Sequence, residues 1–258
     1  MTEIFRNTVI AEHYARHRDN HDDDFIDQLA DQLGRRGSLI DIGAGAGAPA
    51  AALARRGIEV TAVEPSAAMI VQGRRRHPQL GFVRACGEEL PLATDSADAA
   101  LLMYVLHHAD DPIAVLAEAG RVVRPGGRII VVSGSPDSER QGLFRRYFPT
   151  LLPDPPAADE IWWWGLEADL ELGGCRTAVH HVYPNRVLDE DYLRMVECEM
   201  FAPLRLLDPD AFDDGLQMMR AELGRPLPPP EVNVLELHPT GERPFGLEPG
   251  SSRSALLI

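Results

Sequence analysis

The sequence predicts a doubly wound α/β fold, in which a mostly parallel sheet carries helices on both of its faces. Short aliphatic runs alternate with helical patterns through the first half of the chain. A glycine-rich turn, Gly43–Gly47, directly follows the first of these runs. The length of 258 residues suits one domain with a substantial core. Strands of such a sheet end at one edge, and we expect the ligand site there.

Residues 1–36 are expected to form one or two helices ahead of the sheet. Apolar residues recur at helical spacing around Tyr14 and again over Phe25–Leu33. The Tyr14 ring precedes the glycine turn, and we expect it to close over the site. A histidine also recurs at every fourth position, which could form a metal-binding stripe. We interpret it instead as the polar face of an exposed helix and predict no metal site. These histidines are His13, His17 and His21.

The first strand and the turn after it form the centre of the predicted site. Leu39–Ile42 is a short buried strand, with Asp41 near its end. A helix then begins at Ala48, with Pro49 in its first turn, where a missing N–H costs nothing. Glycines in such a turn let the main chain approach a ligand closely. They are Gly43, Gly45 and Gly47.

A second strand, Ile58–Val63, ends in Glu64. Right-handed crossovers bring the ends of neighbouring parallel strands to the same edge of the sheet. The Glu64 carboxylate, about 20 residues beyond the turn, should therefore lie near Asp41 and could accept hydrogen bonds from a ribose diol. Ser66 is expected to cap the following helix.

Three further strands complete the predicted core at residues 37–133. They are Gly81–Ala85, Asp98–Val105 and Arg128–Ser133. A loop after the third strand carries Cys86, Gly87 and Glu88. The helix Ile113–Val123 follows the fourth strand, and we expect Arg124–Gly127 to break it.

Beyond residue 134 the regular alternation stops. We interpret residues 134–250 as a helical cap or insertion followed by a variable C-terminal part, and residues 251–258 as the last strand. Arg176–Tyr183 could add a sixth strand, and 188–223 is mostly helical with breaks at prolines. The aromatic run Trp162–Trp164 suits either a cap core or a clamp for a flat substrate. The prolines that break the helical segment 188–223 are Pro203 and Pro209.

Composition excludes several classes of partner. A formal net charge of −15 would repel a phosphate backbone, so we expect no nucleic-acid partner. The 3 cysteines form no disulfide or zinc pattern, which is typical of a reducing compartment. No signal peptide and no membrane-length apolar run is visible. The sequence predicts a soluble, cytoplasmic protein that acts on a small molecule, and leaves its oligomeric state open.

The motifs together resemble the class I S-adenosylmethionine-dependent methyltransferases. They are Asp41–Gly47, Glu64, Glu88–Pro91, the strand before His107-His108, and Arg124–Gly127. Within that class the chain is similar to the small-molecule enzymes of ubiquinone and menaquinone biosynthesis. The resemblance covers Gly37 to Ser133. It implies a seven-stranded, Rossmann-like methyltransferase fold and S-adenosyl-L-methionine as the cofactor.

The resemblance also implies roles for individual positions. Gly43 and Gly45 would approach the methionine part of the cofactor, and Glu64 would bind the ribose hydroxyls. The loop that carries Cys86, Gly87 and Glu88 would pass the adenine. An aspartate is frequent in the family where Cys86 stands, and a thiol is a weak acceptor. The alternative for Cys86 is a small buried apolar residue.

Candidates for catalysis follow the fourth strand. Methyl transfer is an in-line displacement, so the protein must align the acceptor and, where needed, remove a proton. Tyr104, His107 and His108 would face the methyl group, and a histidine can take up a proton near neutral pH. The alternative is that these histidines cap the next helix or pack under the loop. His180 and His181 are a second pair of candidates, of which only one can face the site.

Other functions fit parts of the pattern. The chain could bind S-adenosylmethionine structurally or catalyse a non-methyl reaction such as a cyclisation. The turn also matches the dinucleotide-binding pattern G-x-G-x-x-A at Gly43, Gly45 and Ala48, which would suit a nicotinamide-dependent oxidoreductase. Asp41 argues against that, because its carboxylate would repel a pyrophosphate but attract an ammonium group.

Overall fold

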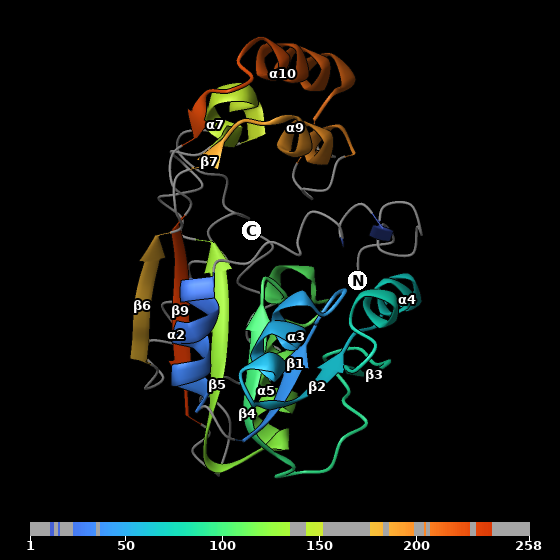
Figure 1. Ribbon diagram of the computed structural model, residues 1–258, viewed down its shortest axis with the longest axis vertical. Coiled ribbons are helices and arrows are strands. Elements are labelled where there is room, and N and C mark those ends of the chain that lie inside the picture. Colours follow the sequence, from blue (N-terminus) through green and yellow to red (C-terminus); the bar gives the residue numbers. More distant parts are fainter. Residues whose placement is uncertain are drawn as a thin grey trace.

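A computed structural model gives the arrangement of the chain (Figure 1). It describes residues 11–12, 15, 23–34, 37–134, 143–151, 176–182, 186–198, 204, 207–227 and 231–238. Several positions singled out in the sequence lie outside the described residues. These are Tyr14, His13, His17, His21, Trp162–Trp164 and the expected last strand at residues 251–258.

A seven-stranded sheet forms the centre of the fold, in the order β3-β2-β1-β4-β5-β9-β6. Its strands are β1 (Ser38–Ile42), β2 (Glu59–Val63), β3 (Gly81–Val83), β4 (Ala97–Met103), β5 (Val123–Gly134), β6 (Arg176–Val182) and β9 (Glu231–Leu237). The strand β9 runs antiparallel to β5 and β6, and the other neighbours are parallel. The doubly wound α/β prediction is confirmed, and β6 lies where it was expected. The strand β9 was not predicted.

Helices cover both faces of this sheet (Figure 1). They are α2 (Asp23–Leu33), α3 (Ala48–Arg55), α4 (Ala67–Arg76) and α5 (Pro112–Val122). Successive residues of a strand point to opposite faces. Accordingly, Leu39 packs in one buried cluster with residues of α2 and α3, whereas Ile40 packs in another with residues of α5. The central strands are thus buried on both sides, which fixes their register.

The fifth strand begins earlier than the sequence indicates. The helix α5 ends at Val122, so the predicted end of the helix before Arg124–Gly127 is confirmed, but Arg124–Gly127 itself belongs to β5, where the pairing with β4 shifts between Ala97 and Ala99. Gly126 adopts a φ of +80° there. A glycine tolerates this left-handed conformation, so the segment bulges and the strand resumes instead of ending.

A second, smaller group of elements has a core of its own. It contains α7 (Leu143–Tyr147), α9 (Glu190–Glu197), α10 (Pro209–Ala221) and the short pair β7 (Arg186–Val187) and β8 (Pro226–Leu227). Figure 1 shows it beyond the upper end of β5, the carboxyl edge of the sheet. Pro209 begins α10 rather than interrupting a helix, because Asp208 caps it by accepting from the Ala211 N–H at 2.9 Å. Within the described part of the chain, no helix has the length and apolar character needed to cross a membrane.

Candidate functional site

The turn between β1 and α3 has the conformation that its glycines predict. Gly43, Gly45 and Gly47 all have positive φ, at +75°, +58° and +79°. The turn is held by its own N–H groups: Gly43 and Ala44 donate to the Val63 carbonyl at 2.8 and 3.0 Å, and Gly47 donates to the Ala44 carbonyl at 2.8 Å. The sequence Gly-Ala-Gly-Ala-Gly therefore closes a tight loop against the end of β2.

Gly43 is needed for space as well as for conformation. A Cβ at this position would lie 2.5 Å from Cγ2 of Val105, which follows the end of β4. No real Cβ contact is that short, so a larger residue would have to displace the turn or Val105. The turn and the segment after β4 are thus pressed together at the carboxyl edge of the sheet.

Asp41 is a buried carboxylate on the central strand. It pairs with Ala62 of β2 and Leu101 of β4, and its side chain is 2% exposed. Its Oδ2 has no hydrogen-bond partner among the described residues. Burial, and to a smaller extent the charge of Glu64, raises the pKa of Asp41 to about 7. An unsatisfied buried carboxylate oxygen is costly, and this atom calls for a partner that the described residues do not supply.

Glu64 lies directly after β2 and is 6% exposed. Its Oε2 accepts from the Gly45 N–H at 2.9 Å, and its Oε1 accepts from the Ser66 N–H at 2.8 Å. Burial raises the pKa of Glu64, and these two hydrogen bonds oppose the rise. Glu64 thereby ties the glycine turn to the start of α4, where Ser66 Oγ accepts from the Met69 N–H as the predicted cap. Each of its oxygens still has a lone pair for a ligand hydroxyl.

The electrostatics of the turn favour a cation over a pyrophosphate. A pyrophosphate binds to free N–H groups of a turn and helix start. Here the N–H groups of Gly43, Ala44, Gly45 and Gly47 already donate to protein acceptors. Asp41 and Glu64 add two buried acidic groups beside them. The arrangement therefore suits a ligand that carries positive charge.

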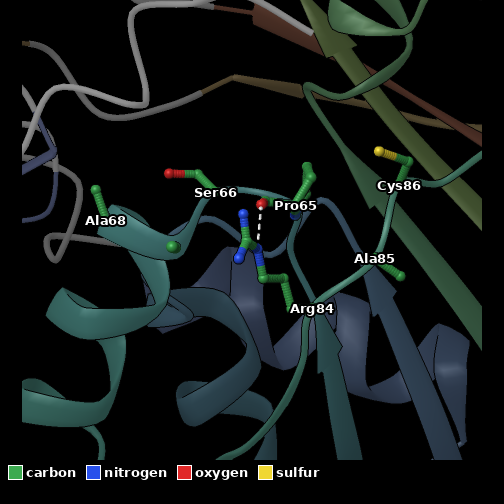
Figure 2. Close-up of a pocket in the computed structure, with 7 residues that line it drawn as sticks. Pro65, Ser66, Ala68, Arg84, Ala85 and Cys86 are labelled. Atoms are coloured by element: carbon green, nitrogen blue, oxygen red, sulfur yellow. Dashed lines mark hydrogen bonds between the residues drawn. The ribbon is translucent and has the colours of Figure 1, made fainter.

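A cavity of about 590 Å³ opens next to Glu64, between the start of α4 and the end of β3 (Figure 2). It is lined by Pro65, Ser66, Ala67, Ala68, Arg84, Ala85 and Cys86. The Arg84 Nε donates to the Pro65 carbonyl at 3.2 Å across this cavity. Arg84 was not among the residues predicted for the site, and its only signal in the sequence is its place near the end of the predicted third strand.

The interpretation of Cys86 as a buried apolar residue is wrong. Its side chain is exposed and lines the cavity, because Cys86 lies in the loop after β3, which ends at Val83 (Figure 2). Gly87 then packs closely: a Cβ there would lie 3.1 Å from both Ile42 and Val115 side chains. Glu88 Oε1 accepts from the Asp110 N–H at 3.0 Å, so this carboxylate joins two loops of the site.

Comparison with known proteins identifies the family. The family described as "Methyltransferase domain" matches residues 40–131, which contain the turn, Glu64 and the loop after β3. This part of the chain is similar to the class I S-adenosylmethionine-dependent methyltransferases. The resemblance seen in the sequence is confirmed, and with it S-adenosylmethionine as the methyl donor of the family.

Curated relatives match less than half of this chain. A demethylmenaquinone methyltransferase of Beutenbergia cavernae is 36% identical over 116 residues, 44% of this chain and 48% of that protein. An uncharacterized methyltransferase of Mycobacterium tuberculosis strain H37Rv is 38% identical over 107 residues, 42% of this chain and 43% of that protein. The chain thus spans somewhat less than half the length of these relatives.

Solved structures share the fold over a longer stretch. A protein of Anabaena variabilis assigned to an antibiotic biosynthesis pathway has a TM-score of 0.60 at 20% identity, covering 83% of this chain and 97% of that one. A Bacillus halodurans protein has a TM-score of 0.54 at 18% identity, covering 84% of this chain and 98% of that one. At these identities the likeness shows the fold alone.

The three catalytic candidates of the chain follow β4 directly. Tyr104 has a φ of +56°, which is strained for a bulky side chain, and its N–H donates to the Val132 carbonyl at 2.9 Å. Its side chain packs beside Met103 in the cluster on the α2 side. The strand alternation is thus broken at Tyr104, at the edge where the turn lies.

His107 and His108 form the end of the short helix η2 (Leu106–His108). Their ring centroids are 4.0 Å apart, with His107 exposed and His108 half-buried. The alternative pair, His180 and His181, lies on β6 opposite Asn233 and Val232 of β9. β6 is the outer strand of the sheet, separated from β1 by β4, β5 and β9. His107 and His108 are therefore the histidines nearer to the turn along the sheet order.

Proposed function

We propose that this chain transfers the methyl group of S-adenosylmethionine to an O, N or C atom of a small molecule. The observation that carries the proposal is the buried, unpartnered Oδ2 of Asp41 beside Glu64 at the glycine turn. These groups fit the cofactor, because its methionine part carries an ammonium group and its sulfur a positive charge. When bound, the cofactor supplies a methyl group that is already activated by the sulfonium.

The proposed roles follow the position of each residue. Asp41 would accept from the ammonium group, directly or through water, and Gly43 and Gly45 would let the main chain approach the methionine part. Glu64, held by Gly45 and Ser66, would accept from the ribose hydroxyls with its remaining lone pairs. The adenine would lie toward the cavity that Cys86 lines.

The adenine contact must come from the main chain rather than from Cys86. A thiol is a weak acceptor, so it is a poor partner for the adenine amino group. The N–H of Gly87 is a better candidate partner for the ring, since Gly87 follows Cys86 in the same loop. Glu88 would act indirectly, because its carboxylate is engaged by the Asp110 N–H.

A small aromatic acceptor suits the chain best. The net charge of −15 disfavours polyanionic acceptors. Curated relatives named demethylmenaquinone methyltransferase make a hydroxylated naphthalene ring system a reasonable first acceptor class to test. The smaller helical group beyond β5 lies at the edge from which such an acceptor would enter (Figure 1).

His107 and His108, which follow β4, are the candidates for a general base, and substitution tests this role. We expect His107→Gln or His108→Gln to lower kcat by about 100-fold or more at pH 7, since a positioned base contributes about 10²–10⁴-fold. The KM for S-adenosylmethionine should stay within about twofold. His238→Gln is the control, because His238 lies beside Gly127 at the start of β5. Unchanged kcat in both variants would remove the histidines from the mechanism.

The experiment for the proposed function measures S-adenosylhomocysteine formed from S-adenosylmethionine with a panel of reduced naphthoquinols, phenols and amines. We expect acceptor-dependent product with at least one phenolic or quinol acceptor. Binding of the cofactor without turnover across the panel would support structural use of the cofactor. Conversion of the acceptor without S-adenosylhomocysteine would instead indicate a non-methyl reaction.

A further inference from the structure

Two residues of α5 outside the site hold the loop that lines it. Glu118 and Arg121 stand one helical turn apart and form a two-pronged ion pair, with Nε–Oε1 at 2.6 Å and Nη2–Oε2 at 2.7 Å. Each strengthens the other: Arg121 lowers the pKa of Glu118, and Glu118 raises that of Arg121. The pair is only partly exposed, so water screens it less than a surface pair.

The same two side chains bind the main chain of the loop after β3. Glu118 Oε2 accepts from the Leu90 N–H at 2.7 Å. Arg121 donates from Nη2 to the Leu90 carbonyl at 3.0 Å and from Nη1 to the Leu92 carbonyl at 2.9 Å. Both polar groups of Leu90 are thereby satisfied by one helix, while its side chain is buried in the α5 cluster.

We call these contacts of Glu118 and Arg121 with Leu90 and Leu92 the anchor. The anchor lies a few residues along the chain from Cys86, which lines the cavity. Between Cys86 and Leu90 the loop is pressed against the end of β1 and α5 at Gly87, and it is tied to Asp110 through Glu88. The segment is therefore short and fixed at both ends. Its main-chain position depends on α5 and not on hydrogen bonds within the sheet.

We propose that Glu118 and Arg121 are positioning residues for cofactor affinity, acting by fixing the main chain of residues 86–90. The inference rests on the proposed function, in which that main chain, and not the Cys86 side chain, meets the adenine. Where main-chain groups bind the adenine, the affinity for the cofactor depends on how firmly the loop that carries those groups is held. Weakening the anchor should therefore cost affinity for the cofactor and leave the methyl-transfer step itself unchanged.

Arg121→Met tests this proposal, because methionine keeps most of the apolar stem and removes all donors. Arg124→Met is the matched control: Arg124 Nη1 donates to Asp98 Oδ1 at 2.7 Å, away from the loop. Glu118→Gln keeps the shape of the side chain and serves if the first variant folds poorly. The measurements are amide hydrogen exchange of residues 86–92 in the ligand-free protein, Kd for S-adenosylhomocysteine, and kcat and KM for S-adenosylmethionine.

For Arg121→Met we expect exchange at residues 86–92 to be about tenfold faster, and Kd and KM to rise about tenfold, with kcat within twofold. Glu118→Gln should show smaller changes in the same direction, and Arg124→Met should leave all of these values within twofold. Unchanged affinity in Arg121→Met, or an equal loss in Arg124→Met, would overturn the proposal. A wild-type protein that binds no S-adenosylhomocysteine would instead refute the proposed function, and the inference with it.

Discussion

Replacing Asp41 with asparagine should make the ligand-free protein more stable and at the same time weaken cofactor binding. The carboxylate is buried and its Oδ2 is unpartnered among the described residues, with a pKa raised to about 7. A rise of about three units corresponds to about 4 kcal/mol between the two protonation states, which is an upper limit for the stability gain. The loss of a charged partner for the ammonium group should raise Kd by about 100-fold.

The stability gain should depend on pH in a defined direction. Because the folded pKa of Asp41 is above the unfolded value of 3.8, the folded state holds the proton more tightly. The contribution of Asp41 to the wild-type free energy of unfolding therefore falls as pH rises from about 4 to about 7 and then levels. The advantage of Asp41→Asn should be small near pH 4 and complete above pH 7. Denaturant unfolding at pH 4.5 and pH 8 measures it.

Asp98→Asn is the matched control for Asp41. Asp98 accepts from the Ser38 N–H at 2.8 Å and from Arg124, and these contacts lower its pKa. Removing this charge should destabilise the protein at neutral pH and leave cofactor affinity within about twofold. If Asp41→Asn were less stable than the wild type at pH 8, or bound the cofactor normally, Asp41 would not be the ligand's partner.

Replacing Gly43 with alanine should strongly destabilise the protein and disrupt the site. The new Cβ would lie 2.5 Å from Val105, and the residue would keep a φ of +75°. We expect a loss of about 3 kcal/mol or more in the free energy of unfolding, since overpacking and left-handed strain each cost about 1–3 kcal/mol. Cofactor binding should become undetectable. Denaturant unfolding and calorimetry measure the two effects.

Three further variants separate the cost of backbone strain from the cost of steric overlap at Gly43. Gly126→Ala places a Cβ at a φ of +80° with nothing within 4 Å, so it should cost only about 1 kcal/mol. Val105→Ala removes both methyl groups that approach Gly43, and the double variant Gly43→Ala/Val105→Ala should recover part of the stability. Equal losses in Gly43→Ala and Gly126→Ala would show that the close approach to Val105 is unimportant.

The core of the fold could be predicted because its signals are local. Glycines at positive φ, a serine cap and aliphatic strands each act within a few residues, and the turn at Gly43–Gly47 and the cap at Ser66 follow the sequence closely. The carboxylates Asp41 and Glu64 were also placed correctly at the sheet edge. Right-handed crossovers between parallel strands bring the carboxyl ends of those strands to the same edge of the sheet, so the position of these two carboxylates follows from the strand order.

The remaining features depend on contacts between distant segments. The strand β9 follows a proline run and becomes a strand by pairing with both β5 and β6. Arg124–Gly127 ends the helix as predicted, but the sequence does not indicate that it lies within β5, where β4 pairs with Val123 before it and with Arg128 after it. The anchor formed by Glu118 and Arg121 reaches a loop 28 and 31 residues earlier, and no helical pattern reveals it.

Calorimetry of the wild-type protein with S-adenosylhomocysteine and, separately, with NAD⁺ tests the central claim most directly. The claim is that the acidic, glycine-rich turn holds S-adenosylmethionine and not a dinucleotide. We expect S-adenosylhomocysteine to bind with a Kd in the micromolar range, about −8 kcal/mol, and NAD⁺ to give no heat of binding. Tight binding of NAD⁺ without binding of S-adenosylhomocysteine would contradict the account.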